Sequence, residues 1–596
     1  MTNNSLMNRS LISIALCASL LGSSLSATPF EKKIGDDVEF FLTIHNLPET
    51  REKWTSHPIT KLFEEDFIAE WFEKAEVSVE IKSESSLNFA EELENTFGLS
   101  VDKFFELFNG QANLAIYNLS DLILRKETRP ELVLMAEFSG DAKQLDELMQ
   151  IQFERNAENH EKTNPQVKHE MIQESFMGET LHFDEVFDGE KTYVEDGYAL
   201  VNGIMVLATP ENRLREAVER IKEDSPTSIS KSAVYQRYRD HTDTGDMTLY
   251  LNLVELIPPL NSAFLELPVL QSLVLFGVTP QSLESALSLE SLQALYTDFE
   301  LVEDGLLLQY GILFGEKLGF LSMINYTDGA LPEAPYVPEG VVSSSVSLFD
   351  LNTMLTKLEK ILGLASPALP PLIDVQIQTL QTNVGVNIRT SILENFGSEI
   401  VNFSVLNKDT TVGINPLQQQ QVLVVDLKDA QAFRDAVNAL KDASPIQPSI
   451  EEQIYEGETI YSMTQPGTPD APEMQINYAI TRSKLIICVG HISLLHEVLS
   501  NMANDKGGFW QNPETKNLFE RIERPNAVAR NFLDIEQFIG PFFKLLAQER
   551  PDNLPASIQS GEVPENLEGS YRLISEVNEE PGSIFGRTLV IKIRKI

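Results

Sequence analysis

The chain has 596 residues, of which 42% are hydrophobic, and it carries 89 Asp and Glu against 46 Lys and Arg. This apolar content is typical of globular proteins and excludes a disordered or collagen-like chain, and the length allows about four domains. The formal charge of -43 repels phosphate backbones and anionic membrane surfaces, so it disfavours nucleic acids and such membranes as partners.

Residues 1–27 have the order of a secretory signal peptide. A polar segment with Arg9 precedes an apolar run at 11–21, and small residues follow at 22–27. The run is too short for a stable membrane anchor, although an uncleaved signal anchor is the alternative. The sequence therefore predicts an exported protein, periplasmic or extracellular. Cleavage would leave Cys488, whose apolar surroundings predict a buried structural thiol.

No second membrane-spanning segment is expected. The most apolar stretch, at 264–278, is interrupted by Glu266 and Pro268 and is too short to cross a bilayer. It has no face rich in Lys and Arg, so a buried helix is preferred over a helix that lies against lipid.

Short segments of the first half of the chain recur in the same order in the second half. The matches join Gly98 and Gly110 to Gly385 and Gly397, 176–182 to 455–461, 198–200 to 478–480, 214 and 218 to 494 and 498, 251–253 to 533–535, and 292 and 296 to 567 and 571. Ordered self-similarity indicates a repeated structural unit. The sequence therefore predicts a tandem duplication, with a first unit at 28–330 and a second at 331–596.

Four apolar runs end in Asn or Asp and continue with the pattern of a helix start. They lie at 41–49, 250–255, 346–351 and 532–537. Such side chains accept hydrogen bonds from the first free N–H groups of a helix. Asp350 and Asp534 are therefore expected to be helix caps and not catalytic groups.

Strand and helix patterns alternate between these segments. Apolar runs at 132–138 and 422–427 predict strands, and each is followed by an Asp-Ala pair that opens a helix pattern. Asp-Gly at 188–189 and Asn-Gly at 202–203 are hairpin signals. Hairpins mixed with single helices predict an α+β fold, with antiparallel sheets and helices packed mainly on one face.

Two glycine-containing boxes, one in each half, carry a resemblance to a family. They are Gly98-Leu99-Ser100-Val101-Asp102 with Leu107-Phe108-Asn109-Gly110-Gln111, and Gly385-Val386-Asn387 with Leu393-Glu394-Asn395-Phe396-Gly397-Ser398. Together with the exported N-terminus, they resemble a family of secreted bacterial proteins of unknown function, which are large, acidic, repeated α+β proteins. The chain departs from that pattern at Gln111 and Ser398, where a second glycine usually stands. The resemblance implies fold and export, and it implies no activity.

Motifs that reactions require at fixed spacing do not occur in this sequence. It has no Gly-x-Ser-x-Gly, no glycine-rich phosphate loop and no Cys-x-x-Cys. The eight histidines are scattered, and His496-Glu497 lacks the second histidine of a zinc helix, while His491 would lie on another helix face. The sequence therefore leaves any catalytic residue unknown, and it predicts no cofactor and no metal ligand.

One pattern partly matches a calcium loop. Asp184, Asp188, Gly189 and Glu195 occupy positions 1, 5, 6 and 12 of such a loop, but position 3 is a valine, which has no ligand atom. A two-residue hairpin turn explains the same residues and is preferred. The acidic run at 240–246 is a second candidate for calcium, and it is equally weak.

The leading hypothesis is an exported, non-enzymatic binding or scaffold protein whose small-molecule or protein partner is unknown. The repeated architecture favours it, as does the lack of any reactive residue that both halves share. One alternative is a periplasmic carrier of an apolar ligand or lipid, which needs an apolar cavity. The other is a hydrolase with a site built from dispersed Asp, Glu and His residues.

Overall fold

A computed structural model describes residues 29–63, 107–124, 129–223, 225, 227–265, 277–407, 419–443, 450–465, 474–504, 507–539, 541–542 and 570–593. The expected signal peptide, the box at 98–102 and most of the apolar stretch at 264–278 lie outside these residues. The described residues divide into two compact units, the first made of 29–60, 107–264 and 292–315, and the second of the remainder. The chain enters the second unit for the last time at Glu316, whereas the sequence suggested a division at 330.

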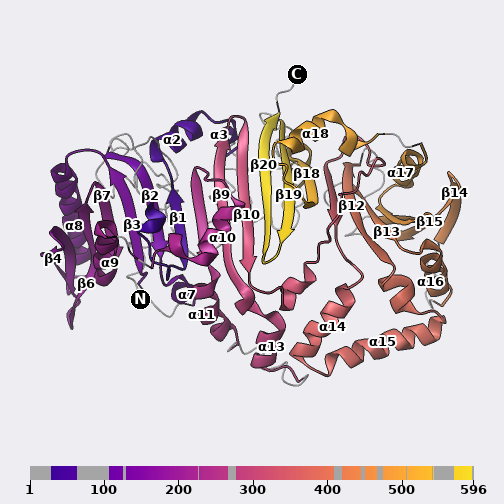
Figure 1. Cartoon of the computed structure of the whole chain (residues 1–596), viewed down its shortest axis with the longest axis horizontal. Helices are drawn as coiled ribbons and strands as arrows, with labels where there is room; N and C mark the ends of the chain where they lie inside the picture. The colour runs from indigo at the N-terminus through magenta and orange to yellow at the C-terminus, as the bar shows by residue number, and fades with distance from the viewer. Residues whose placement is uncertain are drawn as a thin grey trace. The chain divides into compact units, whose positions relative to one another are not determined.

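The strands of the first unit form an antiparallel sheet (Figure 1). They are β1 Phe40–Ile44, β2 Phe108–Ile116, β3 Leu132–Phe138, β4 Lys168–Phe176, β5 Glu179–Phe187, β6 Thr192–Val201, β7 Ile204–Thr209, β8 Met247–Asn252, β9 Leu292–Val302 and β10 Gly305–Phe314. Hydrogen-bonded neighbours follow the order β10-β9-β8-β1-β2-β3-β7-β6-β5-β4. The first strand of the unit is therefore an inner strand, between β2 and β8.

The strands of the second unit also form an antiparallel sheet. They are β11 Ser343–Leu348, β12 Phe396–Leu406, β13 Gln419–Leu427, β14 Ile450–Tyr455, β15 Glu458–Gln465, β16 Met474–Ile480, β17 Lys484–Val489, β18 Ala527–Asp534, β19 Ser570–Glu580 and β20 Ser583–Ile593. Their order is β20-β19-β18-β11-β12-β13-β17-β16-β15-β14. Within the described residues, each strand from β11 to β20 thus occupies the place of its counterpart among β1 to β10.

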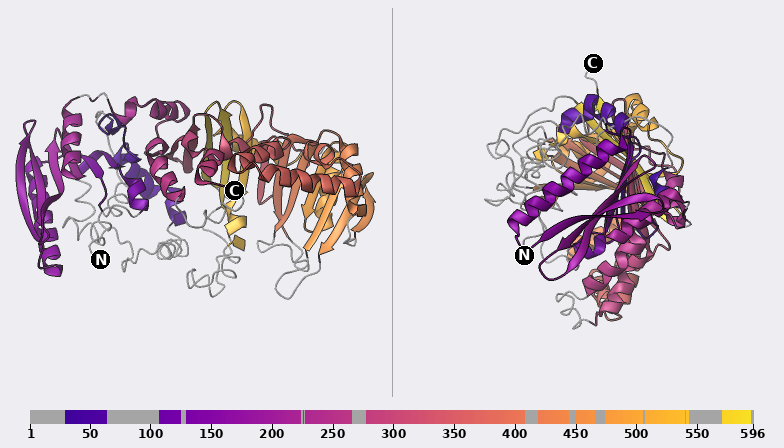
Figure 2. Two further views of the ribbon diagram at one scale, coloured as in Figure 1. Left: turned by 90° about the horizontal axis from the view of Figure 1, so that it is seen from below. Right: turned by 90° about the vertical axis from the view of Figure 1, so that its left-hand side faces the viewer.

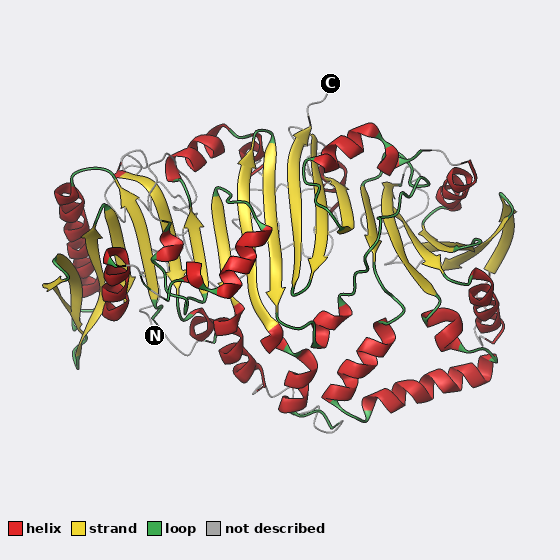
Figure 3. Ribbon diagram, viewed as in Figure 1, coloured by secondary structure: helices red, strands yellow, loops and turns green. Residues whose placement is uncertain are grey.

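Helices follow the strands in both units, so the fold is α+β, as expected (Figure 3). The helices of the first part of the chain are η1 Phe30–Lys32, α2 Leu47–Ser56, α3 Pro58–Phe63, α7 Leu119–Ile123, α8 Ala142–Thr163, α9 Glu211–Lys222, η2 Ile229–Lys231, α10 Ala233–His241 and α11 Leu253–Leu265. Those that follow are α13 Pro280–Leu287, η4 Leu289–Ser291, η5 Gly319–Met323, α14 Met354–Ala365, α15 Leu369–Val384, η6 Arg389–Leu393, α16 Ala430–Ala443, α17 Ile492–Asn504, η7 Phe509–Gln511 and α18 Pro513–Glu520. In the described part of the chain, no helix is long and apolar enough to span a membrane.

The turn between the fourth and fifth strands has the same backbone conformation in both units. Met177 and Gly178 join β4 to β5 with φ of 50° and 81°, and Glu456 and Gly457 join β14 to β15 with φ of 51° and 81°. Two consecutive positive φ angles define the hairpin turn whose twist fits antiparallel strands, and they favour glycine at the second place. The matched segments of the sequence therefore form matched turns.

Gly110 and Gly397, the second glycine of each box, lie where the second strand of each sheet bulges. The register of β2 against β3 shifts between Phe108 and Ala112, and that of β12 against β13 shifts between Phe396 and Ile400. A Cβ on Gly110 would lie 1.9 Å from a carboxylate oxygen of Glu137, and one on Gly397 would lie 2.4 Å from a carboxylate oxygen of Asp426. In both units, a glycine thus leaves room for an acidic side chain from the neighbouring strand.

Helices cover both faces of the first sheet. Tyr198 of β6 stacks with Phe153 of α8, with ring centroids 5.4 Å apart. The adjacent residue, Gly197, faces Leu214 of α9, because a Cβ there would lie 3.0 Å from that side chain. Neighbouring strand residues point to opposite faces, so α8 and α9 lie on opposite faces. The expectation of helices mainly on one face is wrong here. Five consecutive residues of β3 are buried, which is the pattern of a strand covered on both faces.

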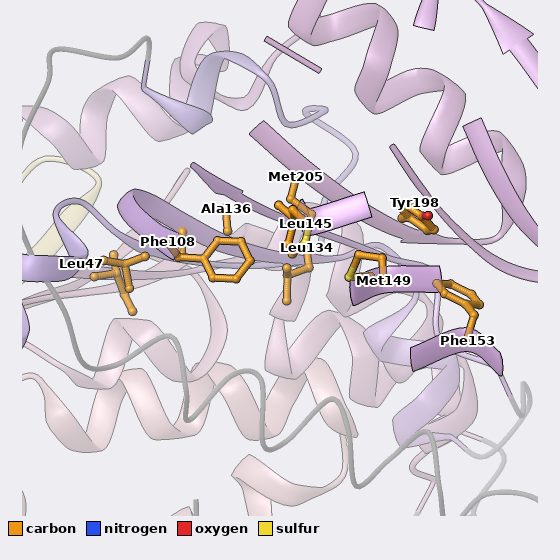
Figure 4. Close-up of a cluster of buried hydrophobic side chains, with 11 residues drawn as sticks. Leu47, Phe108, Leu134, Ala136, Leu145, Met149, Phe153, Tyr198 and Met205 are labelled. Carbon is orange, nitrogen blue, oxygen red and sulfur yellow. The ribbon is translucent and has the colours of Figure 1, made fainter. Parts of the chain in front are cut away.

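The core beneath α8 joins this helix to five strands, β1, β2, β3, β6 and β7, and to α2 (Figure 4). Its buried members are Ile44, Leu47, Phe108, Ala112, Leu134, Ala136, Leu145, Met149, Phe153, Tyr198 and Met205. In the second unit, α16 packs in the same way, since Ala430 and Phe433 lie against Leu427 and Ile480. Burial of such side chains contributes about 1.5–3 kcal/mol each, which fixes the helix after the third strand on the sheet.

Candidate functional site

A bulge in the β5–β6 hairpin places three carboxylates together. Phe183 pairs with Gly197 and Glu185 pairs with Val194, so two residues of β6, Glu195 and Asp196, oppose the single residue Asp184 of β5. Bulges of this kind re-aim side chains and are frequent beside functional sites. The local sequence permits the close approach because Gly197 has no Cβ, which would otherwise lie 2.7 Å from the carbonyl oxygen of His182.

Two histidines meet these carboxylates. His169, near the start of β4, has Nδ1 at 2.9 Å from Oδ2 of Asp184. Its other ring nitrogen, Nε2, lies 2.9 Å from Nδ1 of His160, in the last turn of α8. The backbone N–H of His169 donates to Glu161 at 3.2 Å, which ties the start of β4 to the end of the helix. Figure 2, in its right-hand view, shows α8 beside the strands of this hairpin.

The cluster has an excess of negative groups. Burial, together with the charges of Asp184 and Glu195, raises the pKa of Asp196 to about 8. Its Oδ1 is buried and accepts no hydrogen bond, an arrangement that is rare in folded proteins. The hydrogen bond that His169 donates to Asp184 raises the pKa of His169, against the effect of burial. We name His160, His169, Asp184, Glu195 and Asp196 the hairpin cluster.

The structure separates the four residues of the calcium-like pattern. Asp184 and Glu195 join the hairpin cluster, whereas Asp188 and Gly189 form the turn, where Oδ1 of Asp188 accepts from the N–H of Lys191 at 2.9 Å. The preferred hairpin is therefore correct, although four residues, 188–191, connect its strands where a two-residue turn was expected. Asp246, in the second acidic run, accepts from Lys53 and from the backbone N–H of residue 301, both at 2.7 Å. These two hydrogen bonds give the carboxylate of Asp246 a structural role.

No sequence motif indicated the two histidines of the hairpin cluster as site residues. His160 and His169 belong to no known ligand motif, because one lies on a helix and the other on a strand. The feature that could have indicated them is the short connection between the end of α8 at Thr163 and the start of β4 at Lys168. A connection of that length returns the chain alongside the helix, so residues close to its two ends meet.

The residues singled out in the second half have structural partners. Asp350 accepts from Asn352 and Thr353, and although burial raises the pKa of Asp350, these hydrogen bonds lower it overall. Asp534 accepts from the N–H of Gln537 at 3.1 Å. Asp534 is therefore a helix cap, as expected. Asp350 is not the cap of α14, whose N-cap is Thr353, and it holds the turn that precedes this helix.

His491 and His496 each bind nearby groups and do not converge. Nδ1 of His491 lies 2.8 Å from the hydroxyl of Ser493, and His496 stacks on Tyr455 with ring centroids 4.1 Å apart. Cys488 is fully buried, and burial raises the pKa of its thiol to about 12. These positions carry no reactive arrangement among the described residues.

Among the described residues of the second unit, the hairpin cluster has no counterpart of the same chemistry. His182 and Tyr198 pair across β5 and β6 and stack at 4.5 Å, and Tyr461 and Tyr478 pair across β15 and β16 and stack at 4.8 Å. With the strands aligned on these pairs, Met463 and Ile476 occupy the places of Asp184 and Asp196. The aromatic pair is thus common to both units, and the cluster belongs to the first.

Comparisons with known proteins identify no relative. No protein-family model matches the chain, and no curated protein matches it either. Among solved structures, crystal forms III and I of TP0453 are similar to it at 10% sequence identity, with TM-scores of 0.21 and 0.20. The alignments cover 44% and 45% of this chain and 95% of the TP0453 chain, and scores this low carry no argument.

Proposed function

We propose that the chain is an exported, non-enzymatic binding or scaffold protein, built by tandem duplication of one α+β unit. The observation that carries the proposal is the kind of feature that the two units share. Strand order, the turn after the fourth strand, the glycine beside a carboxylate and the aromatic pair recur in both. Each of these features serves architecture, and none is a nucleophile paired with a general base that recurs in both units.

A duplicated enzyme would be expected to carry its reactive groups in at least one complete, recognisable set. At the matched positions, the second unit has Tyr461 where the first has His182, and Met463 where the first has Asp184, so the two units do not repeat the same acid–base groups. A duplicated surface, in contrast, needs only the fold to persist, because partner contacts vary freely on loops and helices. Export and the bacterial family resemblance stay predictions from the sequence.

Exposed apolar side chains on α15 favour a second candidate, carriage of an apolar ligand or lipid. None of its 16 residues is buried, and Leu372, Val375 and Leu380 are 59%, 54% and 41% exposed. Exposed apolar surface that is contiguous marks interaction sites more often than chance. These side chains would contact an acyl chain or another apolar ligand in the carrier, and a protein partner in the scaffold.

Native mass spectrometry of the protein purified from its own exported fraction separates the two candidates. A reproducible lipid-sized mass increment would support the carrier and contradict the scaffold. A bare mass, together with capture of one defined protein by crosslinking, would support the scaffold.

The double variant Leu372→Ser/Val375→Ser tests whether α15 is the contact surface. Because both side chains are largely exposed, we expect an unchanged melting temperature and a loss of the bound lipid or crosslinked partner. The exposed Ile454, at 79%, provides a matched control as Ile454→Ser. Equal losses in both variants would show that the effect is not specific to α15.

A further inference from the structure

We propose that His160, His169 and Glu195 form a site for one divalent transition-metal ion of the Zn²⁺ class, with Asp184 as a positioning residue. One ligand atom from each of the three residues lies within 4.8 Å of the other two. Two imidazole nitrogens and one carboxylate oxygen are a known ligand set for zinc sites that keep a fourth position open for water or a substrate. The inference goes beyond the proposed binding or scaffold function.

The ring nitrogens already have nearly the separation that a metal requires. Nε2 of His169 and Nδ1 of His160 lie 2.9 Å apart. Zinc–nitrogen bonds of about 2.0–2.1 Å at a tetrahedral angle place two ligand nitrogens roughly 3.3 Å apart. The two rings therefore need to move by only a few tenths of an ångström, and no backbone rearrangement is required.

Asp184 fixes the tautomer that metal binding needs. It accepts from Nδ1 of His169 at 2.9 Å, so the proton stays on Nδ1 and the lone pair of Nε2 faces His160. A carboxylate behind the histidine is the usual second partner in zinc sites, where it orients the ring and increases its basicity. The side chains of His169 and Asp184 are 5% and 11% exposed, so the ring is held firmly in place.

The electrostatics of the hairpin cluster favour a cation. Asp184 and Glu195 lie beside the two imidazoles, and the buried Oδ1 of Asp196 has no hydrogen-bond donor. His160 also lies in the last turn of α8, where the carbonyl end of the helix carries partial negative charge. A bound divalent ion would supply the positive charge that these groups lack.

The chemistry of the donors selects the class of ion. Imidazole nitrogens suit zinc, copper, nickel and iron, whereas calcium and magnesium prefer oxygen ligands. His160 and Glu195 are only half-buried, which gives an ion access to the site from solvent. The site therefore differs from the calcium loop that the spacing of Asp184 and Glu195 suggested.

The test uses the full chain after treatment with a chelator, titrated with ZnCl₂ by calorimetry. We expect saturable binding of one ion, a melting temperature that rises with ZnCl₂, and no comparable effect of CaCl₂. His160→Gln and Glu195→Gln should each lower Zn²⁺ affinity by more than about 100-fold, since each removes a ligand, and second-shell changes alone cost about 10–100-fold. Titration with CoCl₂ should give visible absorption bands that these variants lose.

Matched variants separate a metal site from a structural cluster. His496→Gln and Glu190→Gln remove a histidine and an exposed carboxylate elsewhere, and we expect neither to change Zn²⁺ affinity. Asp184→Asn should lower affinity about 10–100-fold and shift the Co²⁺ bands, which a merely structural role would not do.

Two results would overturn the proposal. One is the absence of saturable Zn²⁺ binding by the chelator-treated chain. The other is unchanged affinity in His160→Gln, a variant of a half-buried residue whose metal-free melting temperature should match that of the parent chain. His169→Gln is a less decisive variant, because its side chain is nearly buried and its loss could unfold the hairpin.

Discussion

The ion pair between Arg530 and Glu576 joins the neighbouring strands β18 and β19, and its removal tests how the second unit tolerates a buried charge. Nε of Arg530 donates to Glu576 at 2.9 Å, and the backbone N–H of Arg524 donates to the same carboxylate at 2.6 Å. Glu576 is 1% exposed and Arg530 is 25% exposed. The variant Arg530→Met keeps most of the side-chain volume and removes the charge.

The expected cost follows from what the carboxylate loses. Breaking a buried pair by removing one partner costs about 3–5 kcal/mol. Arg530 is partly solvated and the Arg524 N–H remains, so we place the loss at the lower limit, about 3 kcal/mol. For a unit of this size that corresponds to a melting temperature lower by about 4–5 °C.

The loss should depend on pH in a defined direction. Burial raises the pKa of Glu576, and the hydrogen bonds from Arg524 and Arg530 only partly oppose it. A raised folded-state pKa means that stability is complete below the unfolded-state value and falls as pH rises through the folded-state value. Without Arg530 the folded-state pKa rises further, so the destabilisation should be larger at about pH 7.5 than at about pH 4.

Calorimetric unfolding at both pH values measures the effect, with Lys441→Met as a control. Lys441 pairs with Glu452 at 2.8 Å on the surface of the same unit, and such pairs contribute about 0–1 kcal/mol. The double variant Arg530→Met/Glu576→Gln should recover part of the stability, because it removes the unpaired charge. Equal losses for Arg530→Met and Lys441→Met, or a loss that is independent of pH, would refute the reasoning.

Three further outcomes are expected. Gly110→Ala and Gly397→Ala should each cost about 1–3 kcal/mol in chemical unfolding, because the new Cβ would lie 2.7 Å and 2.8 Å from a side-chain Cβ across the strand; a neutral result at both would contradict the matched bulges. Cys488 should react with a thiol reagent only on unfolding, since it is fully buried and its pKa is about 12; rapid labelling of the folded protein would be inconsistent with that burial. Burial lowers the pKa of His45, whose Nε2 lies 2.9 Å from the hydroxyl oxygen of Thr248, so its contribution to stability is present above about pH 6.5 and lost as pH falls. His45→Gln should therefore weaken the dependence of the unfolding free energy on pH in this range. An unchanged dependence would exclude His45 as its source.

Local patterns predicted the elements of this fold well. The apolar run at 132–138 is β3 with the expected bounds, and the Asp-Ala pair after it opens α8, which begins at Ala142. The hairpin signal at 188–189 and the cap at Asp534 also formed as predicted. These features depend on interactions between residues that are close in sequence, so the sequence carries their signal directly.

Features that depend on distant residues were not predictable in the same way. The register shift that puts Glu195 and Asp196 opposite Asp184 is decided by how β5 and β6 pack, and no residue spacing encodes it. The meeting of His160 with His169 depends on where α8 ends relative to β4. The spacing of Asp184 and Glu195 therefore suggested a calcium site. It gave no sign of the two histidines, whose ring nitrogens favour a different class of metal ion.

The shared strand order has a consequence for how the chain reaches its native state. β4 to β7 pair with strands that are their neighbours in sequence. β1 pairs in addition with the distant β8, where Leu42 lies opposite Leu249, and β11 pairs with the distant β18, where Val346 lies opposite Arg530. Distant pairings form late because closing long loops is entropically costly. During synthesis, β8 emerges before β11 exists, so vectorial translation favours the correct partner. When the full-length chain refolds from denaturant, all strands are present at once. Both β8 and β18 are then available to β1 and to β11, so a wrong pairing can compete with the correct one.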